Sequence, residues 1–110
     1  MAIISNLTVD QGSTFSATID ITDAEDNILV LTGYTVAAQM RKTYGSSTAT
    51  NFTGSVSNAL QGKVSISLTA TQTNALVAGR YVYDVEITSA GGTVTRVVEG
   101  QVEVTPGVTQ

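Results

Sequence analysis

Residues 79–104 read GRYVYDVEITSAGGTVTRVVEGQVEV. Within this stretch, large apolar side chains alternate with polar ones from residue 81 to residue 87, which is the period-two pattern of a strand with one buried face. The Ser-Ala-Gly-Gly run at 89–92 follows, and its glycines can adopt the positive φ angles of a tight hairpin turn. A second alternating segment runs from residue 93 to about 104. The stretch therefore predicts a long antiparallel hairpin.

The second strand of this hairpin has one irregularity. In a regular strand Arg96 would stand on the buried face, whereas Val97 would point to the opposite, solvent-facing side. The remaining valines would share the buried face: Val94, Val98, Val102 and Val104.

Other alternating segments precede the hairpin, and they predict strands at residues 14–22, 28–31, 34–42, 52–56 and 64–69. Between them, the polar run at 23–27 is expected to be a turn, and the small polar residues at 43–50 are expected to form a loop. Short strands with turns at roughly ten-residue intervals are typical of an all-β sandwich or barrel.

A single helical turn is predicted just before the hairpin. Thr69 is followed three residues later by Gln72, which is the spacing of a capping box. We expect this turn to lie near residues 70–77 and to be closed by Gly79.

The composition restricts the chemistry available to the chain. Its 110 residues include no cysteine and no histidine, and charged residues make up only 13%. Thiol catalysis and disulfide bonds are therefore excluded, and the commonest general base is missing. We expect a structural or binding role, with no enzymatic activity and no cofactor.

The charge argues against nucleic acids and membranes as partners. The formal net charge is -4, and the five cationic residues are scattered, whereas nucleic acids are bound by basic stripes. No segment approaches the ~20 apolar residues of a membrane-spanning helix, and the N-terminus lacks the positive start of a signal peptide. Other proteins are therefore the expected partners.

The turn at residues 23–27 holds the densest set of oxygen ligands. Asp23, Glu25 and Asp26 could offer three carboxylates to Ca²⁺, which takes about six to eight oxygens. Acidic residues and Asn also favour tight turns for purely structural reasons. The segment lacks the glycine and the distant glutamate of an EF-hand loop, so it is a candidate calcium site only, and no metal is predicted.

Two pairs of carboxylates share a face of the predicted hairpin: Asp84 with Glu86, and Glu99 with Glu103. Glycosidases use paired acids at a set separation. Both pairs are expected on the solvent face, where carboxylates are simply hydrated. We interpret them as surface residues.

The low charge content is informative in its own right. A free monomer usually carries ~25–35% charged residues on its surface. Here serine and threonine take their place, and depletion of charge is typical of the cores of interfaces. The sequence therefore predicts a homo-oligomer or a docked subunit.

The segment LVAGRYVY at residues 76–83 resembles the Leu…Gly-x-Tyr segment that enters the penultimate strand of immunoglobulin-like sandwiches. The resemblance implies that the Tyr81 hydroxyl folds back to the chain as a tyrosine corner. Tyr83 stands where an antibody domain has cysteine, so the disulfide of that family is absent. The predicted fold is therefore all-β: a single immunoglobulin-like antiparallel β-sandwich of about seven to eight strands over residues 1–110.

Two longer segments resemble small virion structural proteins of tailed bacteriophages. Residues 6–42 contain an acid-Gln-Gly opening, an acidic turn, Leu-Thr-Gly-Tyr and a strand ending in a basic residue. Residues 62–106 match a Gly-x-Val…Leu-Thr…Leu-x-x-Gly-x-Tyr-x-Tyr-Asp-x-Glu pattern, which is related to the N-terminal domain of phage baseplate upper proteins. The resemblance implies a non-catalytic part of a phage particle and brings no catalytic residues with it. Baseplate upper proteins continue into long further regions, whereas this sequence has 110 residues.

We therefore predict a virion protein, either a capsid decoration subunit or a tail or baseplate accessory subunit, that contacts other virion proteins. Residues 1–9 and 105–110 are predicted as extended arms, and 43–50 as a contact loop. The residues predicted at interfaces are Ile3, Ile4, Leu7, Tyr44, Val104 and Val108. One alternative is a carbohydrate- or receptor-binding β-sandwich module, and another is a calcium-stabilised adhesion domain that uses Asp23, Glu25 and Asp26.

Overall fold

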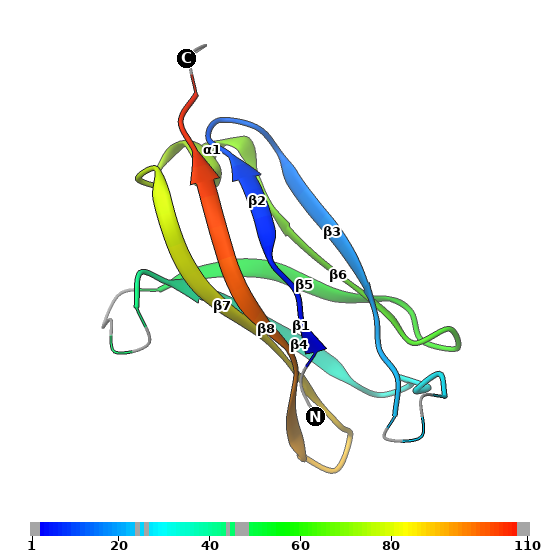
Figure 1. Cartoon of the computed structure of the whole chain (residues 1–110). Coiled ribbons are helices and arrows are strands. Elements are labelled where there is room, and N and C mark those ends of the chain that lie inside the picture. Colours follow the sequence, from blue (N-terminus) through cyan, green and yellow to red (C-terminus); the bar gives the residue numbers. More distant parts are fainter. Residues whose placement is uncertain (1–2, 24, 26, 44, 46–48, 108–110) are drawn as a thin grey trace.

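The computed structural model describes residues 3–23, 25, 27–43, 45 and 49–107 (Figure 1). Over these residues, eight strands and one short helix follow one another. In order they are β1 (Ile3–Ile4), β2 (Leu7–Asp10), β3 (Phe15–Asp20), β4 (Thr35–Arg41), β5 (Thr50–Asn58), β6 (Lys63–Leu68), α1 (Ala70–Asn74), β7 (Gly79–Thr88) and β8 (Val94–Thr105). The prediction of an all-β fold is confirmed.

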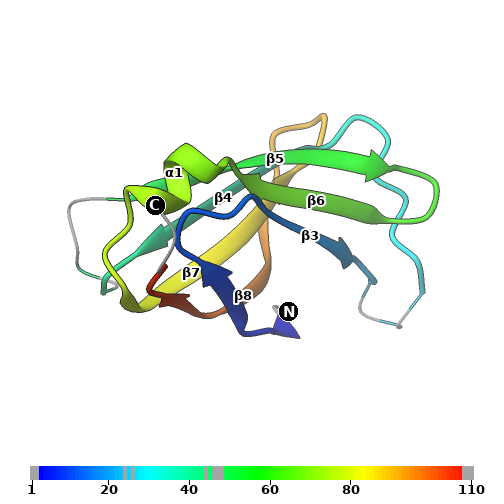
Figure 2. The ribbon, with the colours of Figure 1, turned by 90° about the horizontal axis from the view of Figure 1, so that it is seen from above.

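The strands form one continuous sheet with the order β1-β8-β7-β4-β5-β6-β3. Strand β2 follows β1 along the same edge of β8 and also pairs with β8. Strand β5 joins the two halves, because Thr50–Phe52 pair with β4 while Thr53–Asn58 pair with β6. The neighbours β3-β6-β5 and β4-β7-β8 are those of the two sheets of an immunoglobulin-like sandwich, whereas β1 and β2 pair with β8 and not with β3. The expected sandwich of two separate sheets is replaced by a single sheet that curves back on itself, as the view from above shows (Figure 2).

The core lies inside this curve. Strand β6 supplies a regular inward row, Val64, Ile66 and Leu68, each at most 1% exposed, because its polar residues alternate to the other face. Val85 and Ile87 of β7 are buried equally deeply and belong to the same cluster. The hydrophobic alternation of these two strands therefore produces the core directly.

The helical turn is held by the predicted capping box. The Thr69 hydroxyl accepts from the Gln72 amide at 3.2 Å, and the Gln72 side chain accepts from the Thr69 amide at 2.8 Å. The helix ends at Asn74 with Ala75 as its C-cap, so the expectation that Gly79 closes it is wrong. Gly79 instead begins β7 with φ 143°, a conformation that other residues rarely adopt.

The β7–β8 hairpin forms where it was predicted, but β8 contains a bulge. The Ser89 amide donates to the Thr93 carbonyl at 2.9 Å and closes the turn. Further along, Val85 pairs with Val98 while Glu86 pairs with Arg96, so Val97 is an extra residue on β8.

This bulge corrects the expected faces of β8. Val97 and Val98 are both buried, at 7% and 1% exposure, although they are adjacent. Arg96 consequently moves to the outer face, and Val94, expected to be buried, is 57% exposed.

The N-terminal segment is part of the sheet. Residues 7–9, predicted to lie in an extended arm, belong to β2, which runs parallel to β8 and pairs Leu7 with Val102 and Val9 with Val104. Val9 is completely buried. Thr105, at the start of the second predicted arm, is the last residue of β8, and the Gly107 amide donates to the Gln11 side chain at 3.1 Å.

Between β1 and β2 the chain kinks without losing its register. The Ser5 amide donates to the Glu99 carbonyl at 2.9 Å, as in a regular parallel ladder. The Ser5 carbonyl instead accepts from the Tyr83 hydroxyl, and the Asn6 side chain accepts from the Gln101 amide at 3.0 Å. The side-chain oxygen of Asn6 thus takes the place of the Ser5 backbone carbonyl as the acceptor for the Gln101 amide.

The predicted strand at residues 28–31 is wrong, since this segment forms only a single bridge, between Thr22 and Ile28. It is held instead by isolated backbone bonds. The Leu31 amide, for example, donates to the Ala59 carbonyl at 2.9 Å.

Candidate functional site

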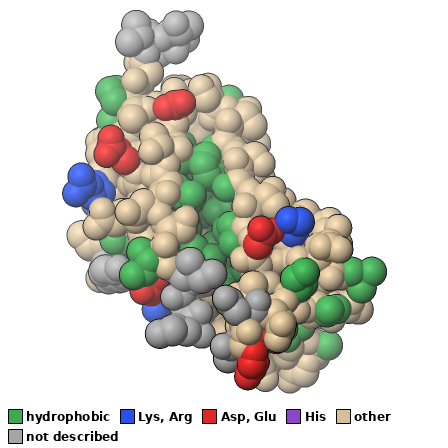
Figure 3. Space-filling model, turned by 45° about the vertical axis from the view of Figure 1, so that its right-hand side comes forward, with side chains coloured by type: hydrophobic (Ala, Val, Ile, Leu, Met, Phe, Trp, Pro, Cys, Tyr) green, Lys and Arg blue, Asp and Glu red, His purple; other side chains and the backbone are tan. Residues whose placement is uncertain are grey.

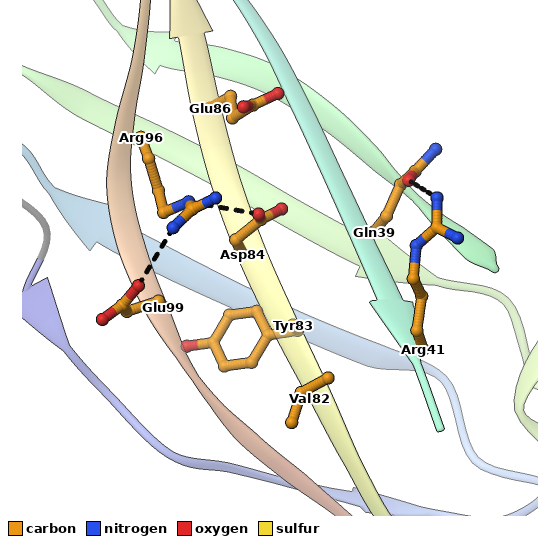
Figure 4. A pocket seen from close by; sticks show the side chains of 8 residues that line it. All are labelled: Gln39, Arg41, Val82, Tyr83, Asp84, Glu86, Arg96 and Glu99. Atoms are coloured by element: carbon orange, nitrogen blue, oxygen red, sulfur yellow. Dashed lines mark hydrogen bonds and ion pairs between the residues drawn. The ribbon is translucent and has the colours of Figure 1, made fainter. Parts of the chain in front are cut away.

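A polar hollow of about 320 Å³ opens on the outer face of β4, β7 and β8 (Figure 4). Because opposite residues of paired strands share a face, the register places Glu86 beside Arg96 and Asp84 beside Glu99. The residues lining the hollow are Gln39, Arg41, Val82, Tyr83, Asp84, Glu86, Arg96 and Glu99.

Arg96 is the centre of the charged cluster. Its Nε lies 3.3 Å from Asp84 Oδ2, and its Nη1 lies 3.4 Å from Glu99 Oε2 (Figure 4). The three side chains are 53%, 36% and 39% exposed, so water screens both ion pairs, and each contributes at most about 1 kcal/mol. The charge of Arg96 is already balanced by two carboxylates from the same sheet.

The bulge at Val97 produces this cluster. Arg96 and Glu99 are three residues apart, and in a regular strand they would point to opposite faces. The extra residue brings both to the outer face, where Asp84 of the neighbouring strand meets them. The alternation of the sequence predicts Asp84 and Glu99 on the solvent face, but it does not predict Arg96 there. The sequence signal for the bulge is the pair of consecutive valines, Val97 and Val98, which interrupts the alternation of the strand.

A second hollow, of about 400 Å³, lies beside the tyrosine corner. The Tyr81 hydroxyl donates to the Val77 carbonyl at 2.7 Å, which confirms the expected corner. Lys42 Nζ lies 4.8 Å from the centroid of the Tyr81 ring, within the range of a cation–π contact. This arrangement stabilises the entry into β7.

Tyr83 is the most buried tyrosine among the described residues, at 4% exposure. Its ring packs edge-on against Phe52, with 6.2 Å between the ring centroids. Burial raises the pKa of the Tyr83 hydroxyl above its ordinary value of 10.0, because the charged phenolate would lose its hydration. This side chain belongs to the core.

One end of the molecule carries an exposed apolar cluster, which we call the apolar end patch: Ile28, Val30 and Leu60. Their exposed fractions are 54%, 50% and 72%. The bond from Leu31 to Ala59 holds their two loops together. Figure 3 shows hydrophobic side chains gathered at this end of the molecule. Exposed apolar side chains that gather in this way mark contact surfaces more often than isolated ones do.

The residues predicted at interfaces have different environments. Ile4 is 75% exposed and available for contact, while Leu7 is partly buried against the core. Val104 is only 2% exposed, so its side chain is a core residue and the prediction of a contact there is wrong. Ile3 lies in β1 and pairs with Val98. Tyr44 and Val108 fall outside the described residues, as do residues 46–48 of the 43–50 contact loop.

The candidate calcium turn is organised by Asp23. Its Oδ1 accepts from the Glu25 amide at 2.9 Å and from the Asn27 amide at 3.0 Å. This is the pattern of a side chain that stabilises its own turn. Asp26 lies outside the described part of the chain. Within that part, no three acidic side chains come together to hold a metal ion.

Over the same described residues, no helix is long and apolar enough to span a membrane.

Comparisons with known proteins find likenesses in structure only. No family model and no curated protein matches the chain. The internalin-like protein lmo2027 of Listeria monocytogenes is similar with a TM-score of 0.45 and 18% identity, over 96% of this chain and 28% of that one. AggA, the major subunit of aggregative adherence fimbriae type I of Escherichia coli, is similar with a TM-score of 0.40 and 17% identity, over 91% of this chain and 89% of that one.

Proposed function

We propose that the chain is a non-enzymatic structural subunit of a tailed-bacteriophage virion, either a capsid decoration subunit or a tail or baseplate accessory subunit. It acts through contacts with other virion proteins. The resemblance of residues 6–42 and 62–106 to such proteins supports this origin.

The residues that carry the resemblance have structural roles. In the acid-Gln-Gly motif, the Asp10 carbonyl accepts from the Ser13 amide at 3.1 Å, and Gly12 has φ 85°. In Leu-Thr-Gly-Tyr, the Tyr34 amide donates to the Leu31 carbonyl at 3.0 Å. These motifs form the turns that enter β3 and β4. The motifs that this chain has in common with those virion proteins therefore determine turns of the fold.

The apolar end patch is the single observation that carries a contact role. Three large aliphatic side chains there are each at least 50% exposed, in a chain with only 13% charged residues. Covering them with a partner would remove apolar surface from water at about 25 cal/mol per Å². A docked subunit is stabilised in this way, whereas a free monomer gains nothing from the exposure.

Analysis of purified particles tests the proposal. Mass spectrometry of density-purified virions of the phage that encodes the chain should find it at a constant copy number relative to the major capsid protein. Leu60→Asp should lower incorporation by at least about tenfold, because a carboxylate would have to be desolvated in the contact. Val77→Asp is the matched control, since Val77 is 73% exposed but lies outside the patch.

Two results would contradict the proposal. One is a chain that is present in the lysate and absent from the particles. The other is equal incorporation of Leu60→Asp and wild type, which would exclude the patch as the contact.

A further inference from the structure

Strand β3 lies at one end of the sheet order, and within the described part of the chain it pairs only with β6. Its other edge therefore presents backbone N–H and C=O groups to the surroundings. An unpaired edge is a template for another strand unless the sequence protects it.

The ladder determines which residues face outward. The Ile21 amide donates to the Gly62 carbonyl at 2.7 Å, so Ile21 points its N–H toward the β6 side. Since successive residues of a strand point their backbone groups to alternate sides, Ala17 and Ile19 also face β6. Ser16 and Thr18 then direct their N–H and C=O groups to the free edge.

This edge has few of the usual protective features. Strand β3 contains neither proline nor lysine, and its register with β6 is regular over all six residues. Its one charged residue, Asp20, stands at the end of the strand and is paired with Lys63 at 2.7 Å. Edge strands that avoid association normally carry lysine, proline or a bulge.

The inner face of β3 is also incompletely covered. Phe15, Ala17 and Ile19 are only partly buried, although they pack against the core. Figure 3 shows a hollow with hydrophobic side chains in it on the side where the sheet does not close, between β2 and β3. A strand added at β3 would extend the inner face over part of this surface.

The sequence of β3 is complementary to itself. In an antiparallel pair of two copies centred on Ala17, Phe15 of each copy would lie opposite Ile19 of the other. Aromatic and β-branched residues make favourable cross-strand pairs. On the outer face Ser16 would lie opposite Thr18, and the two Asp20 carboxylates would stand at opposite ends of the pair.

We infer that β3 pairs antiparallel with β3 of a second copy of this chain, about a two-fold axis at Ala17. The pairing joins the two sheets into one, and the outward groups of Ser16 and Thr18 bond to those of the partner. The inference goes beyond the proposed function, because it names the partner and the surface of self-association and does not require a virion.

Amide hydrogen exchange followed by NMR at two protein concentrations tests it. At high concentration the amides of Ser16 and Thr18 should be protected, and on dilution they should exchange faster by at least about tenfold, in line with a shift in the dimer population. The amides of Ala17 and Ile19 bond to β6, so they should stay protected at both concentrations.

Sedimentation of edge variants provides the second readout. Thr18→Pro removes an outward N–H without removing a bond to β6, and it should raise the dimer dissociation constant by at least about tenfold. Thr18→Ala keeps the backbone donor and should remain a dimer. If the proline variant fails to fold, Thr18→Lys serves instead, with Thr53→Lys on an exposed site of β5 as its control.

The inference is wrong if wild type sediments as a monomer up to millimolar concentration, or if Thr18→Pro dimerises like wild type. It is also wrong if dilution exposes the amide of Thr8 on β2 and leaves Thr18 unchanged. Each of these results leaves incorporation into virions as a separate question, because that is measured on particles.

Discussion

The Tyr83 hydroxyl donates a 2.6 Å hydrogen bond to the carbonyl oxygen of Ser5, a residue 78 positions earlier in the chain. The bond joins the kink between β1 and β2 to the central strand of the same half of the sheet. Gly100 makes the approach possible, because a Cβ there would collide with the Ser5 carbonyl. The contact thus ties β7 to the segment between β1 and β2, which passes close to Gly100 of β8.

Removing this hydroxyl should destabilise the fold. We expect Tyr83→Phe to lower the free energy of unfolding by about 1 kcal/mol, because the partly buried hydrogen bond to the Ser5 carbonyl is lost. Urea unfolding followed by circular dichroism measures the change. Tyr34→Phe is the control, since the hydroxyl that donates to the Ser5 carbonyl is that of Tyr83. An equal loss in both variants would contradict the assignment.

The same residue predicts a dependence of stability on alkaline pH. Burial raises the pKa of Tyr83 in the folded state, so above pH 10 the unfolded chain releases this proton while the folded chain retains it. The stabilisation is fully present below pH 10 and is lost as the pH rises through the folded-state pKa. The fall in unfolding free energy from pH 9 to pH 11 should be smaller for Tyr83→Phe. Equal slopes would show that the tyrosine does not contribute.

Gly100 should not tolerate a side chain. Gly100→Ala forces a Cβ against the Ser5 carbonyl and should cost about 1–3 kcal/mol, as overpacking does in other proteins. Gly91→Ala is the matched control, because the atom nearest to its Cβ would be Ser89 Oγ at 3.9 Å. Thermal unfolding of both variants tests the difference. Similar melting temperatures of the two variants would mean that the segment at Ser5 moves away from residue 100 at no cost in stability.

The bulge makes a separate prediction for adjacent valines. Val97 is 7% exposed and Val98 is 1% exposed, so truncation of either to alanine should cost about 1–3 kcal/mol. Val94→Ala should cost less than about 0.5 kcal/mol, since exposed substitutions usually have small effects. In a regular strand Val97 would face solvent and Val94 would face the core. A small cost for Val97→Ala together with a large cost for Val94→Ala in denaturant unfolding would therefore exclude the bulge.

The acidic turn should be stable without a metal ion. Asp23→Ala should lower the free energy of unfolding by about 0.5–1 kcal/mol, because two turn amides lose their acceptor, whereas Asp23→Asn keeps an acceptor oxygen and should cost less. We expect the melting temperature of wild type to be the same in chelator and in excess Ca²⁺. A rise with Ca²⁺ would instead support the calcium site, since a ligand of the native state stabilises it.

Several features could be predicted because their determinants are close together in the chain. The capping box depends on two residues three positions apart, Thr69 and Gln72. The hairpin turn depends on the consecutive residues 89–92. Strand β6 could be read from its alternation alone. The tyrosine corner, which the resemblance implied, joins two residues only four positions apart, Val77 and Tyr81.

The charged cluster could be predicted only in part. The alternation of β7 correctly placed Asp84 on the outer face, but it gave no information on Arg96, because the face of Arg96 depends on the register between two strands. The apolar end patch was not predicted at all. Ile28 and Leu60 lie in different loops, and only tertiary contacts bring them to the same end.

The sequence by itself determined the all-β class, the hairpin and the inward rows of β6 and β7, because a period of two and local turn residues are sufficient for these. Only the tertiary structure decided that residues 7–10 pair with β8, that β5 divides between two neighbours and that Val97 is an extra residue. Each of these depends on which strand lies alongside, and that choice is made by burial of the whole core and by satisfaction of backbone hydrogen bonds across distant segments.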